Sequence, residues 1–250
     1  AGQKLDAWVA GRFTYHPLDT WRDLIRRKRV LVNGQPTAPD VRLAAGDKVE
    51  YHPADIVEPP VCTAFTILHE DSEMLAVNKP PDLPCHPAGI YFRHTLWHLL
   101  RAQYAEVCFV NRLDRETSGV VLVARNRRAA RHLGKQQERG RMTKPYLALV
   151  EGVFPATLRA TGVLVLDPAS AIYKKRRFQT TGDGERCETE FARVATAGGL
   201  SLVRCQPATG RLHQLRAVLC SLGFPLVGDK VYGVDETMFL RFIGDGLSPA

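Results

Sequence analysis

One loop of the chain gathers residues that can do acid–base chemistry. Residues 111–119 read Asn-Arg-Leu-Asp-Arg-Glu-Thr-Ser-Gly, and the apolar run 120–123 follows directly. Loops mounted on rigid strands often carry reactive groups, and here Asp114 stands between Arg112 and Arg115. We therefore take this loop as a candidate active site. A purely structural cluster of ion pairs is the alternative.

Two later segments also carry reactive side chains. In residues 143–152, Lys144 and Tyr146 are two positions apart, which places both on the same side of a strand. The sequence of residues 209–216 predicts a turn followed by the start of a helix, and this segment includes His213. Tyr146 could equally be a core residue, and we interpret His213 as a hydrogen-bonded structural residue rather than a catalyst.

The charge of the chain favours a polyanionic partner. Lys and Arg total 34 against 26 acidic residues, which gives a net charge of +8 and a pI near 9.3. The imbalance is greatest in residues 125–144, where Glu138 is the one acid among eight bases: Arg125, Arg127, Arg128, Arg131, Lys135, Arg139, Arg141 and Lys144. We expect this stretch, with Lys174–Arg177 as a second basic edge, to contact nucleic-acid phosphates. A solvated helix face is the alternative.

The six cysteines argue against a metal centre. They are widely dispersed, with neither a CxxC pair nor a Cys/His spacing typical of zinc. We find neither a secretory signal nor an apolar run long enough to span a bilayer. The sequence therefore predicts no metal, no membrane, and a cytoplasmic protein with reduced thiols.

The first 52 residues predict a small, separate module. Apolar residues recur at helical spacing from Leu5 to Phe13, and a second helix is expected from Thr20, where Thr20 and Asp23 match a capping box. Strands follow around the turns Asn33-Gly34 and Gly46-Asp47. Three arginines at i, i+4 and i+7 are expected to share a face of the second helix and follow a phosphate backbone, with a solvated face as the alternative: Arg22, Arg26 and Arg29.

The rest of the chain predicts one larger domain. Three prolines interrupt residues 53–60, which we interpret as a linker. Short β-rich runs then alternate with a few helical stretches up to residue 250. This pattern predicts an α+β fold with a mixed, largely antiparallel sheet. The expected domains are residues 1–52, the linker 53–60, and residues 61–250.

Taken together, these segments resemble a known enzyme family. The motif RLDRETSG, the KPY strand start and the helix GRLHQLR occur in the order typical of RluA-type pseudouridine synthases, over residues 58–235. Residues 1–52 resemble the S-four RNA-binding domain, although the usual Ser-Arg before the second helix is absent. The resemblance implies an enzyme that isomerises uridines in structured ribosomal or transfer RNA.

The resemblance also implies roles for particular residues. Asp114 would be the catalytic carboxylate and Arg216 its ion-pair partner, while Tyr146 would stack on the target uracil and Leu215 would wall the pocket. Arg112 would occupy the gap that the flipped nucleotide leaves.

Further residues at motif positions would contact the substrate, and these are Lys144, Arg115, Arg211 and His213. RNA phosphates would be bound by Arg127, Arg128 and Arg131. The family's reaction uses no cofactor, and a monomer is expected. Two positions depart from the family: Asn111 stands where His is usual, and Pro145 lies between Lys144 and Tyr146.

Two other functions fit parts of the same sequence. A catalytically inactive RNA-binding or ribosome-assembly factor would keep the fold, and Asn111 favours it. An N-glycosidase would need a second acid to activate water, for which Glu116 is the candidate.

Overall fold

The computed structural model describes residues 2–13, 16–52, 58–172, 174–233, 235, 237 and 239. The chain divides into two compact units, Ala1–Ala130 and Arg131–Ala250, and its described residues form three separate hydrophobic clusters. The expected linker falls inside the first unit, and residues 53–57 lie outside the described part of the chain. The expected boundaries at 52 and 60 stay a prediction.

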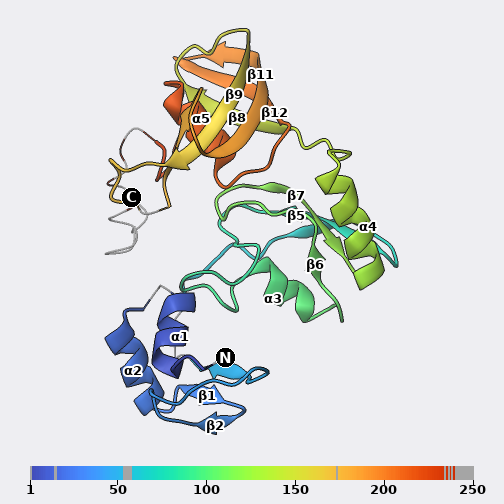
Figure 1. The fold of residues 1–250 in the computed structure, drawn as a ribbon. Coiled ribbons are helices and arrows are strands. Elements are labelled where there is room, and N and C mark those ends of the chain that lie inside the picture. The colour runs from blue at the N-terminus through green and yellow to red at the C-terminus, as the bar shows by residue number, and fades with distance from the viewer. Residues whose placement is uncertain are drawn as a thin grey trace. The chain divides into compact units, whose positions relative to one another are not determined.

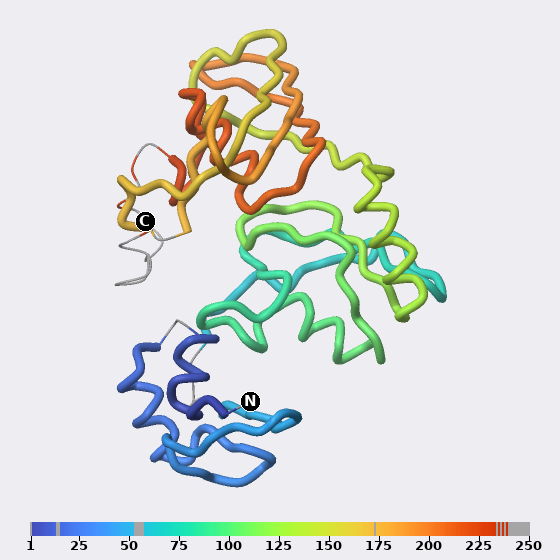
Figure 2. The backbone as a smooth tube through the Cα atoms, in the orientation of Figure 1, coloured from blue at the N-terminus to red at the C-terminus, as the bar shows by residue number. Residues whose placement is uncertain are grey.

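The first cluster lies within the N-terminal 52 residues. Helices α1 (Leu5–Arg12) and α2 (Leu18–Arg26) pack side by side (Figures 1 and 2). Their core includes the fully buried Leu5 and Trp21. Three short antiparallel strands accompany them in the order β2-β1-β3: β1 (Val30–Val32), β2 (Gln35–Pro36) and β3 (Val49–Tyr51).

The predicted Asn-Gly turn is confirmed. Asn33 and Gly34 both have positive φ, 53° and 77°, as the tight turn of a hairpin requires. The Asn33 amide also donates a 2.9 Å hydrogen bond to the carboxylate of Asp47 in the other predicted turn.

Two expectations for α2 are wrong. The helix begins at Leu18 behind Pro17, and no side chain caps it, so Thr20 and Asp23 form no capping box. Trp21 lies in the first turn of this helix and is fully buried in the core. The helix also ends at Arg26, and Lys28 has a φ of 60°, so Arg29 lies beyond the helix and the three arginines do not form one helical stripe.

The second cluster surrounds a four-stranded antiparallel sheet in residues 58–130. Fully buried Leu75, Val77, Val121 and Val123 come from its two central strands. Helix α3 (Leu96–Arg101) supplies Leu96 and Leu100 to the same cluster. The strand order is β4-β5-β7-β6: β4 (Thr66–Glu70), β5 (Met74–Lys79), β7 (Gly119–Ala124) and β6 (Cys108–Phe109).

The third cluster lies in the C-terminal unit. Helix α4 (Arg127–Glu138) precedes the sheet in the chain (Figure 1). Helix α5 (Gln214–Ser221) packs against strands β9 (Thr157–Leu166) and β10 (Arg176–Gln179). The strand order is β10-β9-β11-β12-β8: β8 (Tyr146–Glu151), β9 (Thr157–Leu166), β10 (Arg176–Gln179), β11 (Glu185–Ala197) and β12 (Leu200–Pro207).

These elements confirm the predicted fold class. Helices accompany antiparallel sheets, and the strand pairings of the described residues are antiparallel throughout. None of the helices in the described ranges is both long and apolar enough to cross a bilayer.

Candidate active site

The loop that carries Asp114 connects two neighbouring strands. It leaves β6 and enters β7, which pair antiparallel, so both ends of the loop are held by the sheet. The Asp114 carbonyl accepts a 3.1 Å hydrogen bond from the Thr117 amide, which closes a backbone turn that begins at Asp114. Asp114 itself is half-buried. A loop with fixed ends can therefore present one carboxylate in a defined place.

Asn111 ties the start of this loop to β7. Its side-chain oxygen accepts a 2.8 Å hydrogen bond from the Leu122 amide, and its side-chain nitrogen donates to the Val120 carbonyl at 3.2 Å. The amide side chain thus supplies one donor and one acceptor to the strand. Asn111 therefore has a structural role at this position.

A buried lysine holds the other side of Asp114. Lys79, at the end of β5, is fully buried, and its ammonium donates to the carbonyls of Pro80, Leu83 and Arg115 at 2.8, 2.8 and 3.1 Å. Burial lowers the pKa of Lys79, although nearby acidic groups such as Asp114 partly oppose this. The sequence signal for this role is a lysine that ends an apolar strand directly before a proline.

Arg115 is engaged by side chains from several directions. Its guanidinium donates to the Tyr91 hydroxyl and lies 5.2 Å from the centre of that ring. It also bonds Glu116 at 2.5 Å and lies 3.6 Å from Asp82. Its side chain is 18% exposed, so the residue after Asp114 is firmly held. Arg112 is exposed instead, and its guanidinium meets His86.

In the C-terminal unit, Arg216 has a carboxylate partner that we did not predict. Its Nε and Nη2 atoms donate to the two carboxylate oxygens of Asp229 at 2.6 and 2.8 Å. Burial alone would raise the pKa of Asp229, but hydrogen bonds from Arg216 and from the amides of Val231 and Tyr232 lower it. Asp229 lies thirteen residues after Arg216. The two residues are too far apart in sequence for helical spacing to predict the pair.

Tyr232 organises the same cluster. Its ring is fully buried and lies 5.0 Å from the Arg216 guanidinium carbon. Its hydroxyl is 3.0 Å from His213 Nδ1 and accepts a hydrogen bond from the Arg176 amide at 2.9 Å. His213, directly before α5, has a φ of 55°, which is uncommon for a residue other than glycine. These contacts agree with the structural role expected for His213.

Gln214 shapes the turn before α5. Its amide nitrogen donates to Thr189 Oγ1 and to the Glu188 carbonyl, both at 3.0 Å, and its oxygen accepts from Thr209 and Arg211. This buried side chain therefore joins the turn to β11, a role that the sequence did not reveal.

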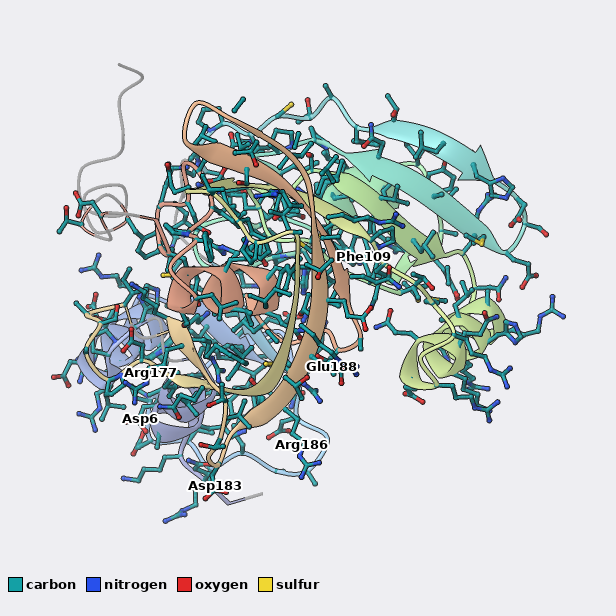
Figure 3. The ribbon with its side chains drawn as sticks, turned by 90° about the horizontal axis from the view of Figure 1, so that it is seen from above. Asp6, Phe109, Arg177, Asp183, Arg186 and Glu188 are labelled. Atoms are coloured by element: carbon teal, nitrogen blue, oxygen red, sulfur yellow. The ribbon has the colours of Figure 1, made fainter. Side chains whose placement is uncertain are left out.

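Arg211 and Lys144 border this turn. The Arg211 side chain donates to the carbonyl of Arg186, which lies on β11 with Glu188 (Figure 3). Lys144 approaches the turn too, since a Cβ at Gly210 would lie 3.7 Å from its ammonium.

Tyr146 and Leu215 are both half-buried and pack against the core of this unit. Tyr146 begins β8, an edge strand of the five-stranded sheet. Lys144 precedes the strand, but burial alternates from Lys144 through Tyr146 to Ala148, as expected for residues on one side.

The structure thus brings the predicted residues together as two groups. Arg112, Asp114 and Arg115 belong to the first unit, and the second unit holds Lys144, Tyr146, Arg211, His213, Leu215 and Arg216. The expected ion pair between Asp114 and Arg216 would join the two units and stays a prediction. No group of three or more His, Cys, Asp or Glu residues in the described ranges is arranged to hold a metal ion.

Several of the basic residues expected to bind RNA form ion pairs with acidic residues of the protein itself. Arg22 pairs with Asp6 at 2.8 Å and with Asp19 at 3.2 Å. On α4, Arg127, Arg128 and Arg131 are exposed, and Arg128 lies 2.6 Å from Glu73. Arg125 lies 3.0 Å from Glu70. The cationic excess near α4 is therefore smaller than the count of bases in that stretch.

Comparisons with known proteins place this geometry in context. The family model described as RNA pseudouridylate synthase matches residues 73–221, which contain the Asp114 loop, the start of β8 and helix α5. The solved structure of human RNA Pseudouridylate Synthase Domain Containing 1 is similar, with a TM-score of 0.59 and 27% identity, covering 72% of this chain and 74% of that one.

Curated relatives from three organisms are 30 to 32% identical to this chain. Ribosomal large subunit pseudouridine synthase C of Escherichia coli is 32% identical over 250 residues, covering 94% of this chain and 78% of the relative. RNA pseudouridine synthase 7 of Oryza sativa is 30% identical, covering 93% of this chain and 61% of the relative. The mitochondrial tRNA pseudouridine(32) synthase of Saccharomyces cerevisiae is 31% identical, covering 86% and 47%. The chain thus spans less than two thirds of the rice and yeast relatives.

Proposed function

Because this chain belongs to the RNA pseudouridylate synthase family, we propose that it converts uridines in structured RNA to pseudouridines with Asp114 as the catalytic carboxylate. The observation that carries the proposal is the position of Asp114, half-buried on a loop whose neighbouring residues are each fixed by the protein.

The proposed reaction rearranges one nucleotide. The bond between the ribose C1′ and the base N1 breaks, the uracil turns, and its C5 bonds to the same C1′. The proton on C5 then leaves, and N1 gains one. The atoms balance within the substrate, so the reaction needs neither an oxidant nor an energy source. It needs an ionised carboxylate, a site that retains the detached base, and a proton acceptor.

Asp114 is proposed to act on the ribose, either as a nucleophile or as a base. A nearby guanidinium favours the ionised form of a carboxylate, and Arg216 is proposed for this role. Tyr146 would stack on the uracil, which contributes about 1 to 3 kcal/mol and helps to offset the loss of stacking in the RNA. Leu215 would wall the site, and Arg112 would fill the gap in the helix.

Phosphate contacts would come from the exposed basic residues. Arg127, Arg128 and Arg131 on α4 are proposed to bind the backbone near the site. The half-buried Lys144, Arg115 and His213, and the exposed Arg211, are proposed to contact the substrate closer to the target nucleotide. Residues 1–52 would form a separate RNA-binding module, and its phosphate contacts would include Arg22, Arg26 and Arg29. The relatives' names include both ribosomal and transfer RNA, so structured RNA is the proposed substrate class. We further propose a monomeric, cytoplasmic enzyme.

Two competing functions are less well supported. The Asn111 side chain holds β7, so its presence is no sign of lost activity. Glu116, the second acid that a hydrolase would require, is already paired with Arg115 within the protein.

The test is product formation on defined RNA. The protein is incubated with unmodified transcripts of transfer RNA and large-subunit ribosomal RNA, and pseudouridine is mapped by carbodiimide adducts that stop primer extension. Site-specific adducts support the proposal. Free uracil would indicate a hydrolase, and tight binding without product on every transcript would indicate a binding factor.

A further inference from the structure

Arg112 is held by a histidine. Its Nη1 donates a 2.8 Å hydrogen bond to Nε2 of His86. Since a guanidinium is only a donor, Nε2 must accept, which requires a neutral imidazole with its proton on Nδ1. The His86 ring lies 6.3 Å from the ring of Phe109 on β6, centre to centre.

His86 sits in a segment that is fixed to the Asp114 loop. The thiol of the preceding residue, Cys85, is buried, donates to the Leu113 carbonyl at 3.3 Å and accepts from the Leu113 amide at 3.4 Å. Further along, Tyr91 bonds Arg115. The segment therefore contacts the loop on both sides of Asp114.

The end of the segment is fixed as well. The carboxylate of Glu58 accepts hydrogen bonds from the amides of Phe92, Arg93 and His94 at 2.7 to 2.8 Å. With contacts at residues 85, 91 and 92–94, the imidazole between them has a defined position relative to Arg112.

The choice of partner matters for the charge of Arg112. A carboxylate would orient the guanidinium but also neutralise it and compete with RNA phosphates. A neutral imidazole acceptor orients the guanidinium and leaves its positive charge in place. A neutral partner therefore fits the proposed role of Arg112, whose side chain must be held in place before binding and must then enter the negatively charged RNA helix.

We propose that His86 is a positioning residue for Arg112, and that its neutral imidazole holds the guanidinium ready to replace the uridine that leaves the RNA helix. This inference rests on the proposed function and deepens it. Protonated His86 cannot accept the hydrogen bond and would place a second cation beside Arg112.

The surroundings of His86 set the direction of the pH effect. Arg112 faces it from the Asp114 loop, Phe109 faces it from β6, and the adjoining Cys85 is close enough to Lys79 and Asp114 to be affected by their charges. Burial, and then the charge of Arg112, lower the pKa of His86. The working neutral form therefore dominates at neutral pH and is lost below the ordinary histidine value of about 6.5.

The test compares single-turnover rates from pH 8 to pH 5 on the same unmodified transcripts. This range lies above the ordinary pKa of carboxylic acids, about 4. The wild-type rate should fall as the pH drops through the His86 pKa and level off at about a tenth of its value at pH 8, because the protonated ring, like the side chain of His86→Ala, offers Arg112 no acceptor. His86→Gln keeps an acceptor that does not titrate, so its rate should be flat. His86→Ala should be about tenfold slower at pH 8, from the loss of one charge-assisted hydrogen bond.

Two further measurements separate the possible failures. His69→Gln changes a histidine that is hydrogen-bonded to Asp71. Its rate should fall at acidic pH in the same way as the wild-type rate. Arg112→Met should raise the pKa of His86, measured by NMR without any substrate. Two results would overturn the role of His86. One is a rate for His86→Gln that still falls at acidic pH, and the other is a His86 pKa that is unchanged by Arg112→Met. An inactive wild type would instead overturn the proposed function.

Discussion

The ammonium nitrogen of Lys79 lies 3.1 Å from the carbonyl oxygen of Arg115, so a fully buried cation holds the backbone immediately after Asp114. The same ammonium donates to two other carbonyls, those of Pro80 and Leu83, in the segment that follows β5. A side chain that joins a strand to the candidate catalytic loop should matter for both stability and rate.

Lys79→Met tests this link. Methionine fills similar space but leaves three carbonyls without their donor, so we expect a loss of about 3 kcal/mol in the free energy of unfolding. Urea denaturation measures the loss. Lys135→Met on the exposed face of α4 is the control and should change stability by less than about 0.5 kcal/mol. Equal stability of both variants would show that Lys79 is not a structural tie.

Asp114→Asn tests the catalytic carboxylate. The change removes charge but little volume, so turnover should fall by at least about a thousandfold while the backbone contacts of the RNA are kept. Product formation and filter binding measure the two effects on the same transcript. A variant that still makes pseudouridine at the normal rate would remove Asp114 from the mechanism.

Asp229→Asn tests the ion pair with Arg216. The change leaves a largely buried guanidinium without its counter-charge, which should cost about 3 to 5 kcal/mol at neutral pH. Because the folded pKa of Asp229 is lowered, its stabilisation is fully present above the ordinary value of about 3.9 and is lost as the pH falls through the folded value.

The pH dependence gives this prediction a second readout. Denaturation of wild type and Asp229→Asn between pH 7 and the acid range should show a difference that shrinks below pH 4. Asp183→Asn, at an exposed position, should show little difference at any pH. A gap between wild type and Asp229→Asn that stays constant into the acid range would contradict the assignment.

Arg131→Gln tests the basic face. If Arg131 on α4 contacts a phosphate, its loss should weaken binding similarly for all RNA sequences and reduce the slope of log affinity against log salt by about one. Arg128→Gln should have a smaller effect, because Arg128 already pairs with Glu73. Equal slopes for wild type and Arg131→Gln would place the RNA elsewhere.

Local features were readable from the sequence because their causes are local. The positive φ values of Asn33 and Gly34 follow from the turn that this dipeptide favours, and the apolar run after the Asp114 loop became the central strand β7. The order of the motifs led to the family. Where a local rule failed, as at the start of α2, burial of Trp21 outweighed the capping preference of Thr20.

Side-chain partners were decided only by the tertiary structure. The sequence supplied Arg216, but the fold brought Asp229 to it, and the fold likewise buried Lys79 beneath the loop and set Cys85 against Leu113. Such pairs join residues that are distant in sequence and depend on how strands and helices pack. Periodicity and turn chemistry describe one segment at a time, and so they contain no information about which distant group will meet a given side chain.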